Sequence, residues 1–284
     1  MTRIMFWDPG HGGAAHLAVG CAVTLALHHT KRILLLNVGS SYGMEEGLRT
    51  GIRDTDGDGL DQALPFSEHG LDALLRVSES GRLTKANFSD YTLPLIGGRL
   101  DLACGSRSEN SDVTGTTISD KKKRDLLVVA DQSYDLLMLH SHNKCPIMDT
   151  IASQHCDVTL VVLEQKRIQL DAFFSELSQM PEPERRKLNI AIALYPYDPH
   201  SSWSLANIKR RYNVSLPIFS IPYNTEFADA WNSREALSFF RKYKLVFSKG
   251  GAREALLGSY RKLSQHLLEK AGSITAHSTS GKGA

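Results

Sequence analysis

Ile4-Met5-Phe6-Trp7-Asp8-Pro9-Gly10-His11-Gly12-Gly13-Ala14-Ala15 is the stretch that decides the fold. It runs from a short apolar segment through a glycine-rich turn into a second apolar stretch, residues 17–27, which predicts a strand, a tight turn and a helix. Such a turn gathers backbone N–H groups at the start of a helix, where the helix dipole favours an anion. The turn therefore predicts a phosphate cradle, although alanine stands where a lysine and a hydroxyl would complete it.

The composition is that of an ordinary globular protein. The 284 residues carry a formal net charge of +2, and 42% of them are hydrophobic, which is enough for one large core. The weak positive charge does not indicate nucleic-acid binding. Because no basic-then-apolar leader opens the chain and no apolar run approaches the roughly 20 residues of a membrane span, we expect a cytoplasmic protein. The cysteines form no CxxC pair, which favours free thiols at Cys21, Cys104, Cys145 and Cys156.

Strand and helix patterns alternate along the rest of the chain. Apolar strands are predicted at residues 32–38, 99–103, 135–140, 157–163, 188–195 and 216–221. Helical patterns are predicted at residues 69–80, 121–133, 147–154, 167–179, 202–212, 224–231 and 233–243. This alternation predicts an α/β fold with a doubly wound, mostly parallel sheet flanked by helices. We expect one domain over residues 1–272, a polar loop at 105–120 and a disordered tail at 273–284.

Several segments in this order resemble MinD/ParA-type (SIMIBI) P-loop ATPases, and their TadZ/CpaE-like branch in particular. The resemblance covers residues 3–245, and its most specific pieces lie late in the chain. They are Cys156-Asp157-Val158-Thr159-Leu160-Val161-Val162-Leu163, Tyr197-Asp198-Pro199, Tyr212-Asn213-Val214-Ser215-Leu216-Pro217 and Ile221-Pro222-Tyr223-Asn224-Thr225-Glu226. Each piece is weak alone, but their shared order is specific. The resemblance implies the P-loop NTPase fold.

The chain departs from this family at the positions that carry its chemistry. The resemblance places a degenerate nucleotide site at Gly10, His11, Gly12, Gly13, Ala14, Ala15, Asn37, His140 and Tyr195. Ala14 replaces the Walker lysine, Ala15 the magnesium threonine and His140 the Walker B aspartate. Asn37 replaces a further aspartate, and Tyr195 the asparagine that reads adenine. Since phosphoryl transfer relies on positive charge and Mg²⁺, we expect a pseudo-ATPase without catalytic residues.

These losses favour a non-catalytic or weakly catalytic scaffold that positions or regulates a pilus, secretion or conjugation assembly. The resemblance implies a homodimer whose partners belong to a membrane-associated assembly. The glycines leave backbone donors for ATP or ADP, with Mg²⁺ only if nucleotide binds; alternatively, the turn serves only the fold.

A helix at 252–271 carries one apolar face, Leu256, Tyr260, Leu263 and Leu267. This face either packs on its own domain or contacts a partner or the inner face of the membrane.

Two other functions remain open. The same fold could be an active ATPase with an atypical loop. Alternatively, Asp8-Pro9-Gly10-His11-Gly12-Gly13 resembles the opening of zinc-dependent N-acetylmuramoyl-L-alanine amidases, and Leu139-His140-Ser141-His142-Asn143 resembles their second ligand segment. The ligand glutamate of those amidases is missing, and Glu45 and Glu46 are poor substitutes.

Four histidines suggest a metal site apart from any of these functions. If the first strand neighbours the strand at 135–140, as in P-loop folds, the histidines after these strands approach one another. Imidazoles grouped in this way are candidate ligands for a transition metal. The residues concerned are His11, His16, His140 and His142. The alternative is four separately hydrogen-bonded or solvated rings.

Overall fold

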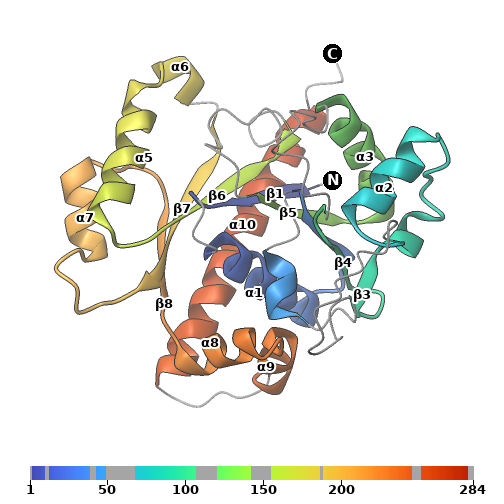
Figure 1. Ribbon diagram of the computed structural model, residues 1–284. Helices are drawn as coiled ribbons and strands as arrows, with labels where there is room; N and C mark the ends of the chain where they lie inside the picture. The colour runs from blue at the N-terminus through green and yellow to red at the C-terminus, as the bar shows by residue number, and fades with distance from the viewer. Residues whose placement is uncertain are drawn as a thin grey trace, which may run out of the picture.

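The structure is a computed structural model that describes residues 2–9, 13–38, 43–48, 68–106, 120–141, 155–185, 188–244 and 251–280. Its centre is an eight-stranded sheet in the order β3-β4-β2-β5-β1-β6-β7-β8 (Figure 1). Within this sheet β3 and β4 pair antiparallel and the other neighbouring strands pair parallel, which confirms the expected doubly wound, mostly parallel α/β sheet. The strands are β1 (Thr2–Trp7), β2 (Ile33–Asn37), β3 (Leu93–Ile96), β4 (Leu100–Ala103), β5 (Leu136–Ser141), β6 (Val158–Leu163), β7 (Ile190–Tyr197) and β8 (Ile218–Pro222).

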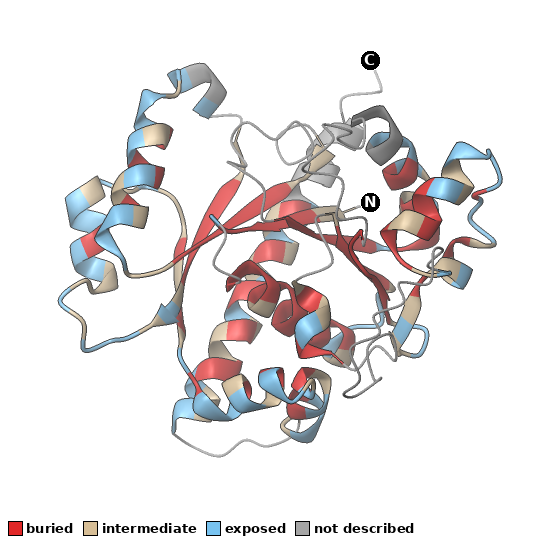
Figure 2. Cartoon of the chain, in the orientation of Figure 1, coloured by how far each residue is buried: buried red, intermediate tan, exposed pale blue. Residues whose placement is uncertain are grey.

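Helices cover both faces of the sheet (Figure 1). One face is covered by α1 (Gly13–His28), α8 (Thr225–Asn232), α9 (Ala236–Lys242), α10 (Ala252–Ser280) and the short 3₁₀ helix η1 (Met44–Gly47). The other face is covered by α2 (Leu71–Glu79), α3 (Asp120–Ser133), α5 (Arg167–Gln179) and α7 (Leu205–Tyr212). The short elements η2 (Phe88–Tyr91) and α6 (Glu182–Arg185) lie in connections. Figure 2 shows the buried residues gathered in the central strands and in the helix faces that meet them.

Strand β1 shows how the chain divides apolar side chains between the two faces. Ile4 and Phe6 belong to the core cluster under α1 and α10. Met5 and Trp7 belong to the cluster under α2, α3, α5 and α7. Successive side chains of a strand point to opposite faces, so a strand that is covered on both sides must be apolar throughout. This is why the central strands appear in the sequence as continuous apolar runs.

Most predicted elements agree with the structure to within a few residues, and three points differ. The sequence does not predict β3, because its four residues include Pro94 and give no long apolar run. The helix expected from residue 202 begins only at Leu205, where the Ser204 hydroxyl accepts a hydrogen bond from Asn207 N–H at 3.4 Å. Helix α10 stays helical through Ser280, beyond the start of the expected tail. The helix expected at 147–154 and residues 107–119 of the polar loop lie outside the described residues.

Helix α10 packs on its own domain. Its apolar face is fully buried in the same core cluster as α1 and comprises Leu256, Tyr260, Leu263 and Leu267. The two helices approach closely because Gly20 faces Tyr260. A Cβ at Gly20 would lie 2.2 Å from Tyr260 Cε1. The face considered for membrane or partner contact is therefore used within the fold. None of the helices in the described ranges combines the length and the hydropathy that a membrane span requires.

The described cysteines are free thiols, as expected. Cys21 and Cys104 are buried, and Cys156 is half-buried. Burial raises the pKa of the Cys21 thiol to about 12. Cys21 is therefore protonated at neutral pH and acts as a small apolar core residue.

Candidate functional site

The functional residues predicted from the sequence meet at the carboxyl ends of the central strands. Strand β5 lies between β1 and β2, and β1 lies between β5 and β6. In this register His140 is opposite Phe6 on one side and opposite Asn37 on the other. Asp8 follows the end of β1. Ligands of open α/β sheets bind at this edge, so the topology gives Asp8, Asn37 and His140 a common location.

The carboxylate of Asp8 occupies the start of α1. Asp8 is 1% exposed, and its Oδ2 accepts a hydrogen bond from Ala14 N–H at 2.8 Å. Ala14 belongs to the first turn of α1, where unpaired N–H groups and the helix dipole attract negative charge. The Asp8 carboxylate thus occupies the start of α1, the position at which a phosphate cradle binds its ligand. Gly10, His11 and Gly12 lie outside the described residues.

The first residues of α1 have no space for larger side chains. A Cβ at Gly13 would lie 3.0 Å from Val162 Cγ1. Ala14 and Ala15 are 0% and 2% exposed and belong to the core cluster around α1. A methyl group neither neutralises phosphate nor binds Mg²⁺. These three residues therefore offer an anion only their backbone N–H groups.

Asn37, Glu45 and His140 form a hydrogen-bonded group at the ends of β2 and β5. The Asn37 amide donates to both carboxylate oxygens of Glu45, at 3.1 and 3.2 Å. Asn37 Oδ1 lies 3.4 Å from His140 Nδ1. Glu45 Oε1 also accepts from the backbone N–H of Gly105 at 2.5 Å. The group therefore connects η1 with β2, with β5 and with the segment that follows β4.

This group fills the region in which the resemblance expects metal-binding carboxylates. Because the Asn37 amide nitrogen donates to Glu45, its oxygen faces His140, which assigns the proton to His140 Nδ1. Gly43 packs against the ring, since a Cβ there would lie 2.9 Å from His140 Cε1. Mg²⁺ prefers carboxylate and water oxygens and rarely takes imidazole. The two residues at these strand ends, Asn37 and His140, are thus poor replacements for aspartate.

A cavity of about 200 Å³ opens beside the start of α1, at the ends of β6, β7 and β8. Three rings and two carboxylates contribute to its wall: His16, Tyr195, Tyr223, Asp8 and Glu164. No Lys or Arg is among the described residues that line it. A polyphosphate in this cavity would therefore meet the carboxylates of Asp8 and Glu164, of which Glu164 pairs with Lys166.

Two polar groups of this cavity shape its chemistry. Burial raises the pKa of the Tyr195 phenol, and the neighbouring Tyr223 adds to this, so Tyr195 stays protonated at neutral pH. Gln169 Oε1 accepts from Glu164 N–H at 2.7 Å, while its buried Nε2 has no hydrogen-bond partner among the described residues. Tyr195, expected at the adenine-reading position, thus lies on the wall of a cavity next to α1.

The two described histidines of the candidate metal site have other neighbours. His16 stacks on Trp231 with ring centroids 3.9 Å apart, and His140 contacts Asn37. His11 and His142 lie outside the described residues. Within the ranges that the structure describes, no three His, Cys, Asp or Glu side chains are grouped to hold a metal ion. The four-histidine site stays a prediction.

Sequence reasoning missed the roles of Asp8 and Glu45. A capping residue stands directly before its helix, whereas Asp8 precedes the whole glycine-rich turn, so its role depends on the path of that turn. Glu45 gave no local signal either, because its contacts come from β2 and from the segment after β4, 8 and 60 positions away in the chain. The order of the strands in the sheet brings Glu45 close to Asn37 and to Gly105.

Comparisons with known proteins identify the fold. Neither a protein-family description nor a curated protein sequence matches the chain. A ParA family ATPase from Chlorobium tepidum TLS superposes with a TM-score of 0.68 at 15% identity, over 94% of this chain and 98% of that one. The MinC:MinD cell division complex of Aquifex aeolicus superposes with a TM-score of 0.61 at 15% sequence identity, over 93% of this chain and 96% of that one. The septum site-determining protein MinD of Pyrococcus horikoshii OT3, complexed with Mg-ADP, superposes with a TM-score of 0.60 at 14% sequence identity. The superposition covers 95% of this chain and 99% of that one. At these identities the likeness establishes the fold alone.

Proposed function

We propose that this chain, which has the fold of the MinD/ParA P-loop ATPases, is a scaffold that splits nucleotide weakly or not at all. In this proposal it positions or regulates a larger assembly. The observation that carries the proposal is the Asp8 carboxylate on the Ala14 N–H group, 2.8 Å apart. P-loop folds bind phosphate at the start of this helix, and here the chain places the negatively charged side chain of Asp8 at that position.

The electrostatics of phosphoryl transfer explain why this contact matters. The transferring phosphoryl group carries several negative charges, and enzymes stabilise it with Lys, Arg and Mg²⁺. Removing a single stabilising donor typically costs about 10²–10³ in rate. Here Ala14 and Ala15 supply no such group, and Asp8 adds a charge of the wrong sign. We therefore expect turnover many orders of magnitude below that of an active P-loop ATPase.

The group of Asn37, Glu45 and His140 supports the same conclusion. An active enzyme needs its metal-binding side chains to be free to meet Mg²⁺ and water. Asn37 instead donates to Glu45 and accepts from His140, so its amide is used inside the protein. The Pyrococcus neighbour is complexed with Mg-ADP. We propose that this chain binds such a nucleotide weakly or not at all.

The assembly that the scaffold serves follows from the resemblance to the TadZ/CpaE-like branch. We propose a pilus, secretion or conjugation complex, served by a homodimer of this chain. The Aquifex neighbour is a complex of MinD with MinC, which shows that this fold can present a protein-binding surface. Size-exclusion chromatography with light scattering, with and without ATP, tests the dimer. A monomer under both conditions contradicts that part of the proposal.

Isothermal titration with ATP and Mg²⁺, paired with a phosphate-release assay on the same sample, tests the central proposal. We expect weak or no binding and no release above the protein-free rate. Mg²⁺-dependent release that is lost when Gly13 is replaced by Val would instead establish the active ATPase. A peptidoglycan-release assay on the same preparation tests the amidase alternative, and we expect no product.

A further inference from the structure

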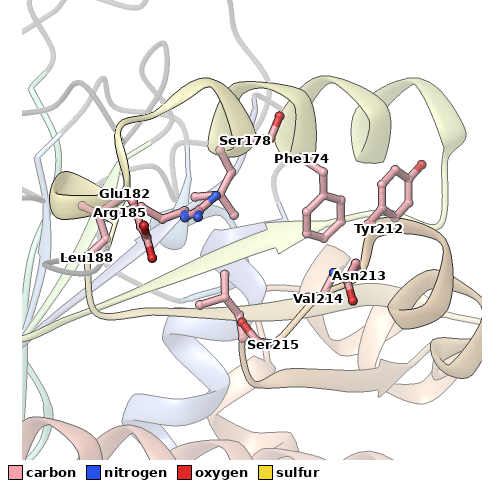
Figure 3. Close-up of a pocket in the computed structure, with 11 residues that line it drawn as sticks. Phe174, Ser178, Glu182, Arg185, Leu188, Tyr212, Asn213, Val214 and Ser215 are labelled. Carbon is pink, nitrogen blue, oxygen red and sulfur yellow. The ribbon is translucent and has the colours of Figure 1, made fainter.

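A larger cavity lies at the opposite end of the sheet from Asp8 and His140. It occupies about 690 Å³ between α5, α6 and the connection from α7 to β8 (Figure 3). Two of its lining residues, Leu188 and Leu216, lie just before β7 and β8. The cavity thus lies at the amino ends of these parallel strands, away from the edge that holds the candidate nucleotide site.

One wall of this cavity is apolar and well fixed. Its apolar residues are Phe174, Leu177, Leu188, Val214 and Leu216. Phe174 stacks on Tyr212, with ring centroids 4.5 Å apart and planes 20° from parallel. The Tyr212 hydroxyl donates to Asp171 Oδ1 at 2.6 Å, and Arg167 donates to Asp171 Oδ2 at 3.1 Å. These bonds hold the aromatic wall in place before any ligand arrives, which reduces the entropic cost of binding.

Arg185 gives the cavity a cation at its α6 end. Figure 3 shows Arg185 and Glu182 at one end of the cavity, with Phe174 and Tyr212 at the other. The Arg185 side chain makes no ion pair or hydrogen bond within the described part of the chain, whereas Glu182 has a partner of its own. The Glu182 carboxylate lies at the same end of the cavity, but no ion pair joins it to Arg185 among the described residues. A guanidinium that lies beside apolar side chains and makes no such ion pair is suited to an anion that also carries an apolar body.

The last turn of α7 adds positive charge near this cavity. It carries Lys209, Arg210 and Arg211 immediately before Tyr212. The Arg211 guanidinium lies over the rings of Trp203 and Tyr212, 5.2 and 5.8 Å from their centroids. These cations stabilise the C-terminal end of the helix dipole. Arg211 also opposes the negative charge of Asp171, which accepts the hydrogen bond from Tyr212. The surroundings of the cavity therefore favour an anionic ligand over a cationic one.

We propose that this cavity binds a free amphipathic carboxylic acid, with its apolar body on the Phe174 side and its carboxylate on the Arg185 guanidinium. The volume lies within the roughly 300–1,000 Å³ of small-molecule sites. A guanidinium meets a carboxylate through two parallel N–H···O bonds. The Arg185 guanidinium matches one carboxylate, and the apolar part of the wall around Phe174 suits a hydrocarbon or aromatic body. The proposal does not depend on the proposed scaffold function, because the two sites lie at opposite ends of the sheet.

Titration of the full chain with sodium octanoate, followed by calorimetry and by NMR, tests the proposal. 1-Octanol serves as the matched uncharged probe. We expect octanoate to bind at least about tenfold more tightly than 1-octanol, because the charged hydrogen bonds to Arg185 are lost with the alcohol. Arg185→Gln should weaken octanoate about tenfold and leave 1-octanol unchanged. Arg82→Gln is the control, since Arg82 is an exposed cation after α2 that does not line the cavity.

A second variant tests the site without removing the cation. Ser215 is an exposed residue of the cavity wall, so Ser215→Glu adds a negative charge without disturbing the core. It should weaken octanoate and spare 1-octanol. Equal affinity for the two probes, or octanoate binding that Arg185→Gln leaves unchanged, overturns the proposal. Absence of octanoate binding to the folded wild-type protein also overturns it, whatever the protein does with ATP.

Discussion

The side-chain amide of Asn37 donates to both oxygens of the Glu45 carboxylate, at 3.1 and 3.2 Å. Asn37 ends β2, and Glu45 lies in η1, so this pair joins the sheet edge to the turn beside it. Hydrogen bonds to a charged group contribute about 1.5–3 kcal/mol each when they are buried. Asn37, at which the resemblance expects an aspartate, is therefore part of the protein's own structure.

Replacing Asn37 by Asp should be destabilising, although it restores the residue expected in active relatives. The new carboxylate would face Glu45 at hydrogen-bond distance, and the repulsion would raise the pKa of the pair in the folded state. A carboxyl group with a raised folded pKa costs stability as the pH rises above its unfolded pKa of about 4. We expect a loss of about 1–3 kcal/mol at pH 7 that shrinks toward pH 4, measured by urea unfolding. The exposed variant Asn232→Asp should stay within about 0.5 kcal/mol of wild type. A loss that is the same at both pH values contradicts this account.

Replacing Asp8 by Asn should increase the affinity for phosphate-containing anions. The amide oxygen can still accept from Ala14 N–H, whereas the negative charge at the start of α1 disappears. We expect pyrophosphate, titrated calorimetrically, to bind about tenfold more tightly to the variant than to wild type, which is about 1.4 kcal/mol. The variant should also lose about 0.5–1 kcal/mol of stability, because a charged cap is replaced by a neutral one. The exposed variant Asp90→Asn should change neither quantity, and unaltered anion affinity in Asp8→Asn contradicts the role given to Asp8.

Gly20 and Gly258 provide a matched pair of glycine-to-alanine changes in helices. A Cβ at Gly20 would lie 2.2 Å from Tyr260 Cε1, while a Cβ at Gly258 would meet nothing within 4 Å. Gly20→Ala should therefore force α1 and α10 apart and cost at least about 1–3 kcal/mol. Gly258→Ala should gain about 0.5–1 kcal/mol from the better helix propensity of alanine. Thermal unfolding of both variants measures the difference, and equal shifts in Tm would count against the observed packing.

Tyr260 should make the protein sensitive to alkaline pH. Burial raises the pKa of its phenol well above the usual value, and Tyr195 and Cys21 reinforce this. An acid whose pKa is raised in the folded state keeps its stabilising contribution below the unfolded pKa, about 10 for tyrosine, and loses it as the pH rises further. Tyr260→Phe should cost about 0.5–1.5 kcal/mol at pH 7, because it removes the hydrogen bond to the His16 carbonyl. That deficit should narrow between pH 9 and 11, whereas the exposed variant Tyr223→Phe should follow wild type. A constant deficit across this range is the contrary result.

Leu263 and Lys262 test whether the face of α10 serves the core or an external surface. Leu263 is fully buried, and Lys262 beside it is exposed. Leu263→Ala should lower the free energy of unfolding by about 2–5 kcal/mol, and Lys262→Ala by less than about 0.5 kcal/mol. Denaturant unfolding measures both values. A neutral Leu263→Ala variant would mean that the helix does not rely on this face for folding.

The sequence predicts the sheet well because strands that are buried on both faces appear in the sequence as apolar segments. β2, β5 and β6 are buried along their whole lengths, so each is apolar except for Thr159 in β6 and the polar residues that end β2 and β5. The sequence also predicts that Asn37 and His140 lie at the same edge of the sheet, because the carboxyl ends of parallel strands meet at one edge. The contacts of Asp8 with Ala14 and of Gly20 with Tyr260 do not follow. The first depends on the path of a turn, and the second joins residues 240 positions apart, so no local pattern encodes either.

The Asp8 contact has a consequence for how the protein responds to the cell. Asp8 and Ala14 are six residues apart in one chain, so the carboxylate is present beside the helix start at a fixed, high effective concentration. A dissolved anion would have to displace it, and no dilution of the protein weakens it. We therefore expect the occupancy of this position to be set when the chain folds and to depend little on the concentration of dissolved anions.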